Sequence, residues 1–328
     1  MLLLTRDDVE RLMTMREAIA ALRSLFVELG QGAVDLPERT VLDVGSAGGA
    51  ALFMPAHVPA MRGLGLKVVG VFPDNPATHG LPRVLASILL LDPSTGQVAA
   101  MVDGTWLTAL RTAAVSAVAT ERLARADARD LLVFGAGVQA RSHVSAMLEV
   151  REIERVTVVA PRRAAVDAAV ADLERAHGHR CAISGATDAG EALAHADIVV
   201  TVTTSRRPVF DGSRLRPGTH VNAVGSFKPD VQEVDELTVS RARVFVDHRA
   251  SALAEAGDLL VPIARGVIGE EHVLADLGDL ACQRHPGRTT PDQITLFKSV
   301  GLAAEDIAVA GFVLERALAE GRGRSIAW

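Results

Sequence analysis

Short apolar segments alternate with segments of helix-forming residues between about positions 130 and 290. Strands that alternate with helices need crossover connections, which are almost always right-handed. The pattern therefore predicts an α/β fold in which a parallel, doubly wound Rossmann sheet carries helices on its faces. After the first strand, the predicted strands are VTVVA, CAIS, IVVTVTT, THVNAVG and RVFVD, with helices near residues 164–177 and 188–196.

A glycine turn joins the first strand of this region to its first helix. The apolar run before Gly135 is followed by Gly137 and then by a helical segment up to Leu148. Gly135 allows a tight turn, Gly137 lets the backbone approach a phosphate, and Ala140 stands where a third glycine would lie. The N–H groups and positive dipole end of the helix then face the pyrophosphate of a dinucleotide. The alternative is a plain strand-to-helix turn.

The first hundred residues follow a different pattern. Residues 15–32 carry apolar side chains at helical spacing and end in glycine, which predicts an amphipathic helix. Short apolar segments bounded by Gly, Pro or Asp come next, and a turn at residues 93–96 joins the last two. We expect a mainly antiparallel or mixed sheet. The predicted strands are ERTVLDV, AALFMPA, LGLKVVGVF, VLASILLLD and QVAAMVDG.

The chain ends in a segment predicted as a long helix over about residues 303–320. The spacing of its apolar residues gives this helix one apolar side, so we expect that side to be buried against the rest of the protein. We expect it to return to the first part of the chain, which leaves the dinucleotide domain inserted. The expected domains are 1–112 plus 300–328, and 113–299. The apolar side is predicted to carry Ala303, Ile307, Ala310, Leu314 and Leu318.

Charge and composition exclude several classes of function. The net charge of −6 and the pI near 5.9 leave no basic surface for nucleic acid. No apolar run approaches the roughly 18 residues of a membrane span, and acids follow the first leucines at once. We therefore expect a cytoplasmic protein without a signal peptide or membrane contact. Cys181 and Cys282 form no CxxC and the histidines form no paired motif, so we expect no disulfide and no metal.

Three cations are candidates for binding an anionic substrate. Arg111 lies on a mainly apolar helix face, and a buried guanidinium needs a partner such as a carboxylate or phosphate. Lys67 is the only charge on its strand face, where it could hold a carboxylate or, with a lowered pKa, exchange protons. Arg39 lies before or on another strand. The alternatives are an ion pair of Arg111 with an acid such as Asp103, and surface positions for the other two.

Residues after the later strands are candidates for the rest of the cofactor site. The second strand leads to Arg162 and Arg163, where an enzyme that prefers NAD would usually have Asp or Glu for the ribose hydroxyls. Arginine accommodates a 2′-phosphate instead, so the sequence favours NADPH, with NADH as the alternative cofactor. The other reading is a pair of exposed arginines at a helix start, where the helix dipole disfavours them. Residues small enough for a nicotinamide ribose end the next strands at Thr201, Thr203, Val224 and Gly225.

With these residues assembled, the chain resembles the ornithine cyclodeaminase and mu-crystallin family. The resemblance implies a Rossmann domain inserted into a domain that binds the substrate and forms a homodimer. It implies that Arg39, Lys67 and Arg111 bind a substrate carboxylate beside the nicotinamide. It also implies a cofactor border of Val138, Gln139, Arg162, Thr201, Val224 and Ser299. The matching stretches span nearly the whole chain and are LKVVGVFPDNPATHGLP, SILLLDPSTGQVAAMVDGTWLTALRTAAVSAVA, VFGAGVQARSH, HVNAVGSFKPDVQEVD and TLFKSVGLAAEDIAVA.

Two departures from the family's cyclodeaminases narrow the reaction that the resemblance implies. Where those enzymes carry an aspartate that handles the ornithine amine, this chain has Phe227, and where they use a second acid it has Ala50. A pocket without both carboxylates has little to hold a distal ammonium. The stretch GSFKPDVQEVD looks like that of the pyrroline-2-carboxylate reductases, although Asp230 could be a displaced acid.

The hypothesis that follows is an NADPH-preferring oxidoreductase that acts on a C=N bond. It would reduce a cyclic imino acid, 1-pyrroline-2-carboxylate or 1-piperideine-2-carboxylate, to L-proline or L-pipecolate. Arg111 and Arg39 would clamp the carboxylate, and Lys67 would complete the clamp or relay a proton. The alternatives are ornithine cyclodeamination, an alanine-dehydrogenase type of reaction, and a non-catalytic NADPH-binding protein of the mu-crystallin type.

Overall fold

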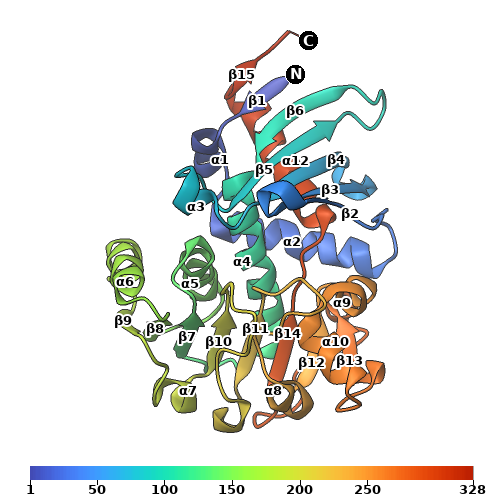
Figure 1. The fold of residues 1–328 in the computed structure, drawn as a ribbon. Helices are drawn as coiled ribbons and strands as arrows, with labels where there is room; N and C mark the ends of the chain where they lie inside the picture. Colours follow the sequence, from blue (N-terminus) through green and yellow to red (C-terminus); the bar gives the residue numbers. More distant parts are fainter. Residues whose placement is uncertain (328) are drawn as a thin grey trace. The chain divides into compact units, whose positions relative to one another are not determined.

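The computed structural model describes residues 1–327 and divides the chain into two compact units. The first unit consists of residues 1–112 and the chain from Gly301 onward, and the second consists of residues 113–300. The second unit is therefore an insertion into the first. The α/β class is confirmed, since the second unit contains a parallel sheet with helices between its strands (Figure 1).

The first unit is built on a seven-stranded mixed sheet, in the order β15-β1-β6-β5-β4-β3-β2. Neighbouring strands are antiparallel except for β1 and β6, which are parallel. The mixed sheet predicted for the first hundred residues is thus present, with one short strand added at each end of the chain. The strands are β1 (Leu2–Leu4), β2 (Thr40–Val44), β3 (Gly49–Val58), β4 (Gly63–Val71), β5 (Val84–Leu91), β6 (Val98–Asp103) and β15 (Arg324–Ser325).

Helices α2 and α12 pack against each other, and α12 packs against β3 and β4. α2 begins at a capping box in which Thr14 and Glu17 satisfy each other's backbone N–H groups. On α12 the expected apolar side is wrong at its far end, because Leu318 is exposed and Ala317 is buried. The helices of this unit are α1 (Arg6–Leu12), α2 (Met15–Gly30), α3 (Asn75–Thr78), α12 (Ala303–Glu320) and the first part of α4 (Gly104–Leu123).

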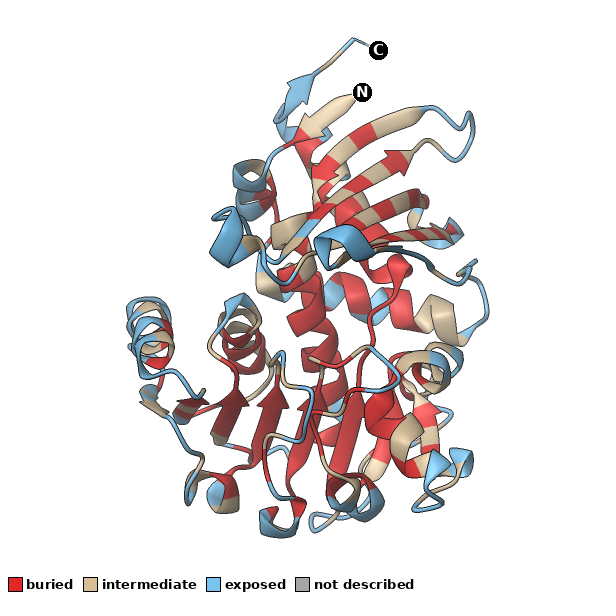
Figure 2. Ribbon diagram, viewed as in Figure 1, coloured by how far each residue is buried: buried red, intermediate tan, exposed pale blue. Residues whose placement is uncertain are grey.

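The second unit contains an eight-stranded parallel sheet, in the order β13-β12-β14-β11-β10-β7-β8-β9. Its central strands β7, β10, β11 and β14 are almost wholly buried, so they appear red in Figure 2. This burial explains why their sequences are continuous apolar runs rather than alternating ones. The strands are β7 (Asp130–Phe134), β8 (Arg155–Val159), β9 (Ala182–Ala186), β10 (Ile198–Thr201), β11 (His220–Ala223), β12 (Arg243–Val246), β13 (Val273–Asp276) and β14 (Thr295–Lys298).

The glycine turn joins β7 to the helix that follows it. It lies at the carboxyl end of β7, where the strand order of the sheet reverses between β7 and its neighbour β10. β7 is followed along the chain by β8 on one side, while β10 lies on its other side. Ligands of doubly wound sheets bind at the carboxyl ends of the strands at such a point. The helices of the unit, besides the end of α4, are α5 (Val138–Val150), α6 (Arg163–His177), α7 (Ala192–His195), α8 (Glu236–Arg241), α9 (Arg249–Glu255), α10 (Gly257–Ala264) and α11 (Leu277–Ala281).

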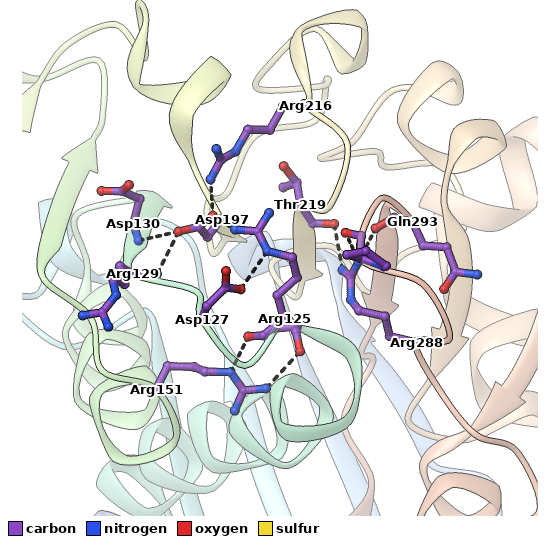
Figure 3. A network of polar contacts seen from close by, with 12 residues as sticks. Arg125, Asp127, Arg129, Asp130, Arg151, Asp197, Arg216, Thr219, Arg288 and Gln293 are labelled. Carbon is purple, nitrogen blue, oxygen red and sulfur yellow. Dashed lines mark hydrogen bonds and ion pairs between the residues drawn. The ribbon is translucent and has the colours of Figure 1, made fainter.

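At the opposite, amino edge of this sheet, polar contacts around the buried Asp197 hold the strand starts together (Figure 3). Asp197 accepts hydrogen bonds from the backbone N–H groups of Arg129 and Asp130, at 2.8 and 3.0 Å, and from the side chain of Arg125. Arg151 and Arg288 donate to backbone carbonyl groups at the end of α4. These contacts satisfy carbonyl groups that a helix leaves without partners.

Candidate functional site

In the first unit, two cations and two acids lie together away from solvent. We call this group the buried cluster, and its members are Lys67, Arg111, Glu305 and Asp306. Asp306 Oδ1 lies 2.9 Å from Lys67 Nζ and 3.1 Å from Arg111 Nε. Glu305 Oε2 lies 2.5 Å from Arg111 Nη1. The most exposed of the four side chains has a relative accessibility of only 6%. Ionised groups at such depth need partners, and here each one has an oppositely charged neighbour.

Three elements bring the buried cluster together. Lys67 lies on β4, which runs between β3 and β5, and its side chain points to the face that α12 covers. Glu305 and Asp306 lie in the first turn of α12, where the helix dipole favours acids. Arg111 is carried by α4. A surface lysine on an edge strand, the alternative for Lys67, is therefore wrong.

Arg39 reaches the same segment from the loop before β2. Its Nη2 donates a hydrogen bond of 2.5 Å to the carbonyl oxygen of Gly301. A Cβ atom built on Gly301 would lie 2.8 Å from Arg111 Nη1, so the two guanidinium groups flank one residue. The three predicted cations therefore converge within the first unit. Arg39 itself is half-buried.

Burial changes the acid strength of Lys67. It lowers the pKa of Lys67 to about 8, because the loss of hydration outweighs the attraction of Asp306. An amine with this pKa is mostly charged at pH 7, and it gives up a proton far more readily than an exposed lysine does. Lys67 can therefore attract a carboxylate and can also donate a proton.

The two acids of the buried cluster were not predicted from the sequence. Asp103, the acid suggested as a partner for Arg111, accepts instead from the backbone N–H of Trp106, at 3.0 Å. The ion pair itself exists, with Glu305 and Asp306 as its acids. A signal was available, because two adjacent acids interrupt an otherwise apolar helix start.

The second unit contains the predicted glycine turn in the form that a dinucleotide site needs. Gly135 has φ of +121°, and a Cβ atom there would lie 2.6 Å from the carbonyl oxygen of Val202. Gly137 is the N-cap of α5, and a Cβ atom there would meet nothing within 4 Å. Ala140 is fully buried, whereas Val138 is exposed and Gln139 half-buried. The open space at Gly137 and the uncapped helix end fit a phosphate group.

The two arginines after β8 differ in their environment. Arg162 is the exposed N-cap residue of α6, and its side chain has no ion pair or hydrogen bond within the described chain. Arg163 is also exposed but pairs with Asp167 one turn later, at 2.8 Å. Arg162 therefore presents a guanidinium that is available to an anion.

A buried glutamate, Glu233, ties the carboxyl ends of β10 and β11 together. Its carboxylate accepts from Thr201 Oγ1 at 3.0 Å, and from the backbone N–H groups of Thr203 and Gly225 at 2.6 Å each. Burial raises the pKa of Glu233. The residues predicted to border the cofactor are thus held in place by an acid that the sequence analysis did not single out.

The end of β14 carries a second buried group of charges. Lys298 Nζ lies 2.9 Å from Asp258 Oδ2 and donates to the carbonyl oxygen of Ser226 at 2.5 Å. Asp258 Oδ1 accepts from the backbone N–H of Glu233 at 2.6 Å. Ser299, a predicted cofactor residue, is buried and donates to Asp247 Oδ2 at 2.9 Å. Val224 is half-buried at the end of β11.

The positions of the missing cyclodeaminase acids bear on substrate choice. Phe227 packs against the apolar core of the second unit. Asp230 pairs with Arg206 at 2.6 Å, and both side chains are about two-thirds exposed, so this acid already has a partner on the surface. Ala50 lies on β3.

A surface hollow of about 610 Å³ lies at the amino edge of the second sheet, lined by Arg125, Asp127, Arg288 and their neighbours. Arg125 is bonded to Asp127 and Asp197, and Arg288 donates to backbone carbonyl groups (Figure 3). The hollow is on the wrong edge for a Rossmann ligand and its cations are already satisfied. We assign these arginines a structural role.

Residues 1–327 contain neither a cluster of metal ligands nor a helix suited to a bilayer. No group of three or more His, Cys, Asp or Glu side chains in this range is placed to hold a metal ion. No helix in it combines the length and the apolar character that crossing a bilayer requires.

Known proteins are similar to this chain over nearly its whole length. The model of the ornithine cyclodeaminase/mu-crystallin family matches residues 1–321. The chain is 36% identical over 327 residues, 99% of both chains, to a Delta(1)-pyrroline-2-carboxylate reductase from Bacillus cereus. It is similar to the Thermococcus litoralis Delta(1)-pyrroline-2-carboxylate reductase in complex with NADH and L-proline, with 40% identity, TM-score 0.96 and coverage of 99% and 100%. An archaeal alanine dehydrogenase dimer with bound NAD gives 35% identity, TM-score 0.93 and coverage of 100% and 99%.

Proposed function

Since the chain belongs to the ornithine cyclodeaminase/mu-crystallin family, we propose that it is an NAD(P)H-dependent reductase of cyclic imino acids. The substrate would be 1-pyrroline-2-carboxylate or 1-piperideine-2-carboxylate, and the product L-proline or L-pipecolate. Support comes from the similar Thermococcus litoralis enzyme, whose structure contains NADH and L-proline.

The observation that carries the proposal is the convergence of three cations in the first unit, one of them a lysine with a lowered pKa. In formal charge the two cations and two acids of the buried cluster cancel, and Arg39 adds one positive charge. A single substrate carboxylate would therefore leave the five side chains and the ligand neutral. Such a balance suits a small monocarboxylate, because a buried charge is costly without a counter-charge.

The second unit fits a nicotinamide dinucleotide. The pyrophosphate would lie at Gly135, Gly137 and the start of α5, where a Cβ-free position opens onto free space. Arg162 would bind a 2′-phosphate, which makes NADPH the preferred cofactor. When bound, the nicotinamide supplies a hydride for the imine carbon.

Lys67 would supply the proton that the same reaction needs. Reduction of C=N to CH–NH adds a hydride to carbon and a proton to nitrogen, and Lys67 Nζ gives the proton and becomes a neutral amine. It then regains a proton from solvent after the product leaves. Arginine could not do this, because its pKa is too high, so the guanidinium groups of Arg39 and Arg111 orient the carboxylate.

An alanine-dehydrogenase type of reaction is a second candidate, because an archaeal alanine dehydrogenase is 35% identical over the full chain. It needs the same carboxylate clamp and the same proton, but an open-chain imine formed from ammonia. Ornithine cyclodeamination is disfavoured by Phe227 and Ala50, which provide no carboxylate for the distal amine.

The deciding assay follows the oxidation of NADPH and NADH by the change in nicotinamide absorbance. Pyrroline-2-carboxylate and piperideine-2-carboxylate are compared with pyruvate plus ammonia, and ornithine is assayed separately for ammonia release. The proposal predicts the highest kcat/KM with a cyclic imino acid. Ammonia release from ornithine without net change in nicotinamide absorbance would replace it with the cyclodeaminase, and binding of NADPH without turnover would replace it with a non-catalytic role.

We further propose that the first unit binds the substrate and dimerises, that the second binds the cofactor, and that the protein works as a homodimer in the cytoplasm. A similar archaeal alanine dehydrogenase is a dimer. Light scattering coupled to size-exclusion chromatography tests the oligomeric state, because the mass should be twice the 34.5 kDa of one chain.

A further inference from the structure

One carboxylate oxygen of Asp306 links the two most deeply buried cations of the first unit. Oδ1 lies within hydrogen-bond distance of both Lys67 Nζ, at 2.9 Å, and Arg111 Nε, at 3.1 Å. Asp306 has no exposed surface, and its second oxygen, Oδ2, accepts no hydrogen bond among the described residues. An internal ion pair built only for stability would be expected to use both oxygens, since a buried acceptor without a partner is costly.

The choice of amino acid at position 67 is unusual for this chain. Of its 34 basic residues, only Lys67, Lys228 and Lys298 are lysine, and the others are arginine. For holding a carboxylate the planar fork of arginine is the better ligand, whereas lysine alone can lose its proton near neutral pH. A lysine at this buried position can therefore give up its proton, which an arginine in its place could not do.

A proton donor must stay charged until it reacts, and burial opposes that. Loss of hydration lowers the pKa of Lys67, and the neighbouring Arg111 lowers it further, while Asp306 and then Glu305 raise it. These are the charged groups that face Lys67, two from α12 and one from α4. The residues opposite Lys67 on β3 and β5 are apolar. Asp306 Oδ1 lies 2.9 Å from Lys67 Nζ, whereas Glu305 Oε2 lies 2.5 Å from Arg111 Nη1.

We infer that Asp306 is the positioning residue of the catalytic centre: through Oδ1 it fixes Lys67 and Arg111 relative to each other and keeps Lys67 protonated for transfer to the imine nitrogen. The inference rests on the proposed function and deepens it. The step transfers no proton to Asp306, because the proton moves from Lys67 to the substrate and is replaced from solvent. Glu305 serves Arg111, and so the carboxylate clamp, rather than the proton.

The test compares three variants with the wild type in the full-length protein. Asp306→Asn removes the charge, Asp306→Glu restores it, and Glu305→Gln is the matched control on the adjacent residue. Each variant is first checked by circular dichroism and thermal melting. The rate of imino-acid reduction is then measured against pH with saturating NADPH.

In Asp306→Asn the fall of activity on the alkaline side should move to lower pH by about one unit or more, because an opposite charge in contact is lost. Asp306→Glu should return the alkaline fall of activity most of the way to its wild-type pH. Glu305→Gln should raise KM for the imino acid and move the alkaline fall less than Asp306→Asn does. A purely structural Asp306 would lower the melting temperature and leave the pH of the fall unchanged, and that result would overturn the inference.

A second readout does not depend on activity. With isotope-labelled lysine, a chain with three lysines gives three side-chain NMR signals, and Lys67→Met identifies the one from Lys67. That signal should titrate at lower pH in Asp306→Asn than in wild type, and an unchanged titration overturns the inference. If the wild type reduces no imino acid, the proposed function fails while this titration still decides the role of Asp306.

If Asp306→Asn does not fold, the wild-type protein provides the test. The carboxylate carbon of Asp306 should then show a chemical-shift change at the pH where Lys67 loses its proton. A carboxylate signal that is indifferent to that titration would show that the two side chains are not coupled, which also overturns the inference.

Discussion

Cofactor choice can be tested through Arg162, whose guanidinium has no partner within the described chain. A hydrogen bond to a charged group contributes about 1.5 to 3 kcal/mol when it is well shielded from water. Arg162 is exposed, so solvent screening reduces its interaction with a 2′-phosphate to roughly 1 to 2 kcal/mol. Since about 1.4 kcal/mol is a factor of ten, Arg162→Ala should lower kcat/KM for NADPH about 5- to 30-fold and leave that for NADH nearly unchanged.

The neighbouring arginine supplies the control for this prediction. Arg163 is already paired with Asp167, so Arg163→Ala should change the ratio of NADPH to NADH by only about twofold. For each variant, kcat/KM for NADPH is divided by kcat/KM for NADH, both measured with a saturating imino acid at low and at high salt. The preference for NADPH should weaken as the salt concentration rises. A wild type that prefers NADH, or an Arg162→Ala variant that loses both cofactors equally, would refute the assignment.

Three further predictions concern the reacting groups and the strand ends. Reduction by the wild type should decline as the pH rises through about 8, because the lowered pKa of Lys67 is where it loses its proton; a pH profile of kcat checks this. Lys67→Arg keeps the charge but cannot release the proton, so kcat should fall by about 100-fold or more while NADPH affinity, measured by fluorescence titration, stays the same. In Gly225→Ala the new Cβ would lie 2.5 Å from both Glu233 Oε1 and the carbonyl oxygen of Thr203, so urea unfolding should show a loss of about 1 to 3 kcal/mol and NADPH should bind more weakly.

Much of the fold was predictable because its signals are local. The alternation of apolar runs with helical segments identifies the parallel sheet, and the glycine turn marks where its first helix begins. The place of β14 between β11 and β12 was not predictable, because strand order depends on pairing between distant segments. The strand at Leu2–Leu4 is too short to give a periodic signal.

The site was predicted in its cations but not in its acids. Lys67 stands out as the only charge on an apolar strand face, and Arg111 as an arginine on an apolar helix face. Both can be recognised because a buried charge is rare without an oppositely charged partner. The role of Asp306 depends on which turn of α12 meets β4, and that contact joins positions 239 residues apart. The role of Glu233 could not be predicted for the same reason, since its hydrogen-bond partners lie at the ends of two other strands.

The burial of lysines has a practical consequence for handling the protein. Lys67 and Lys298 are fully buried, whereas Lys228 is exposed on the loop after β11. Reagents that acylate or alkylate amines should therefore find one lysine side chain besides the amino terminus, and the mass should rise by one or two labels instead of a broad distribution. The protein can then be coupled to a surface through two defined positions, and any enzyme that acetylates lysine side chains has a single accessible target on the folded chain.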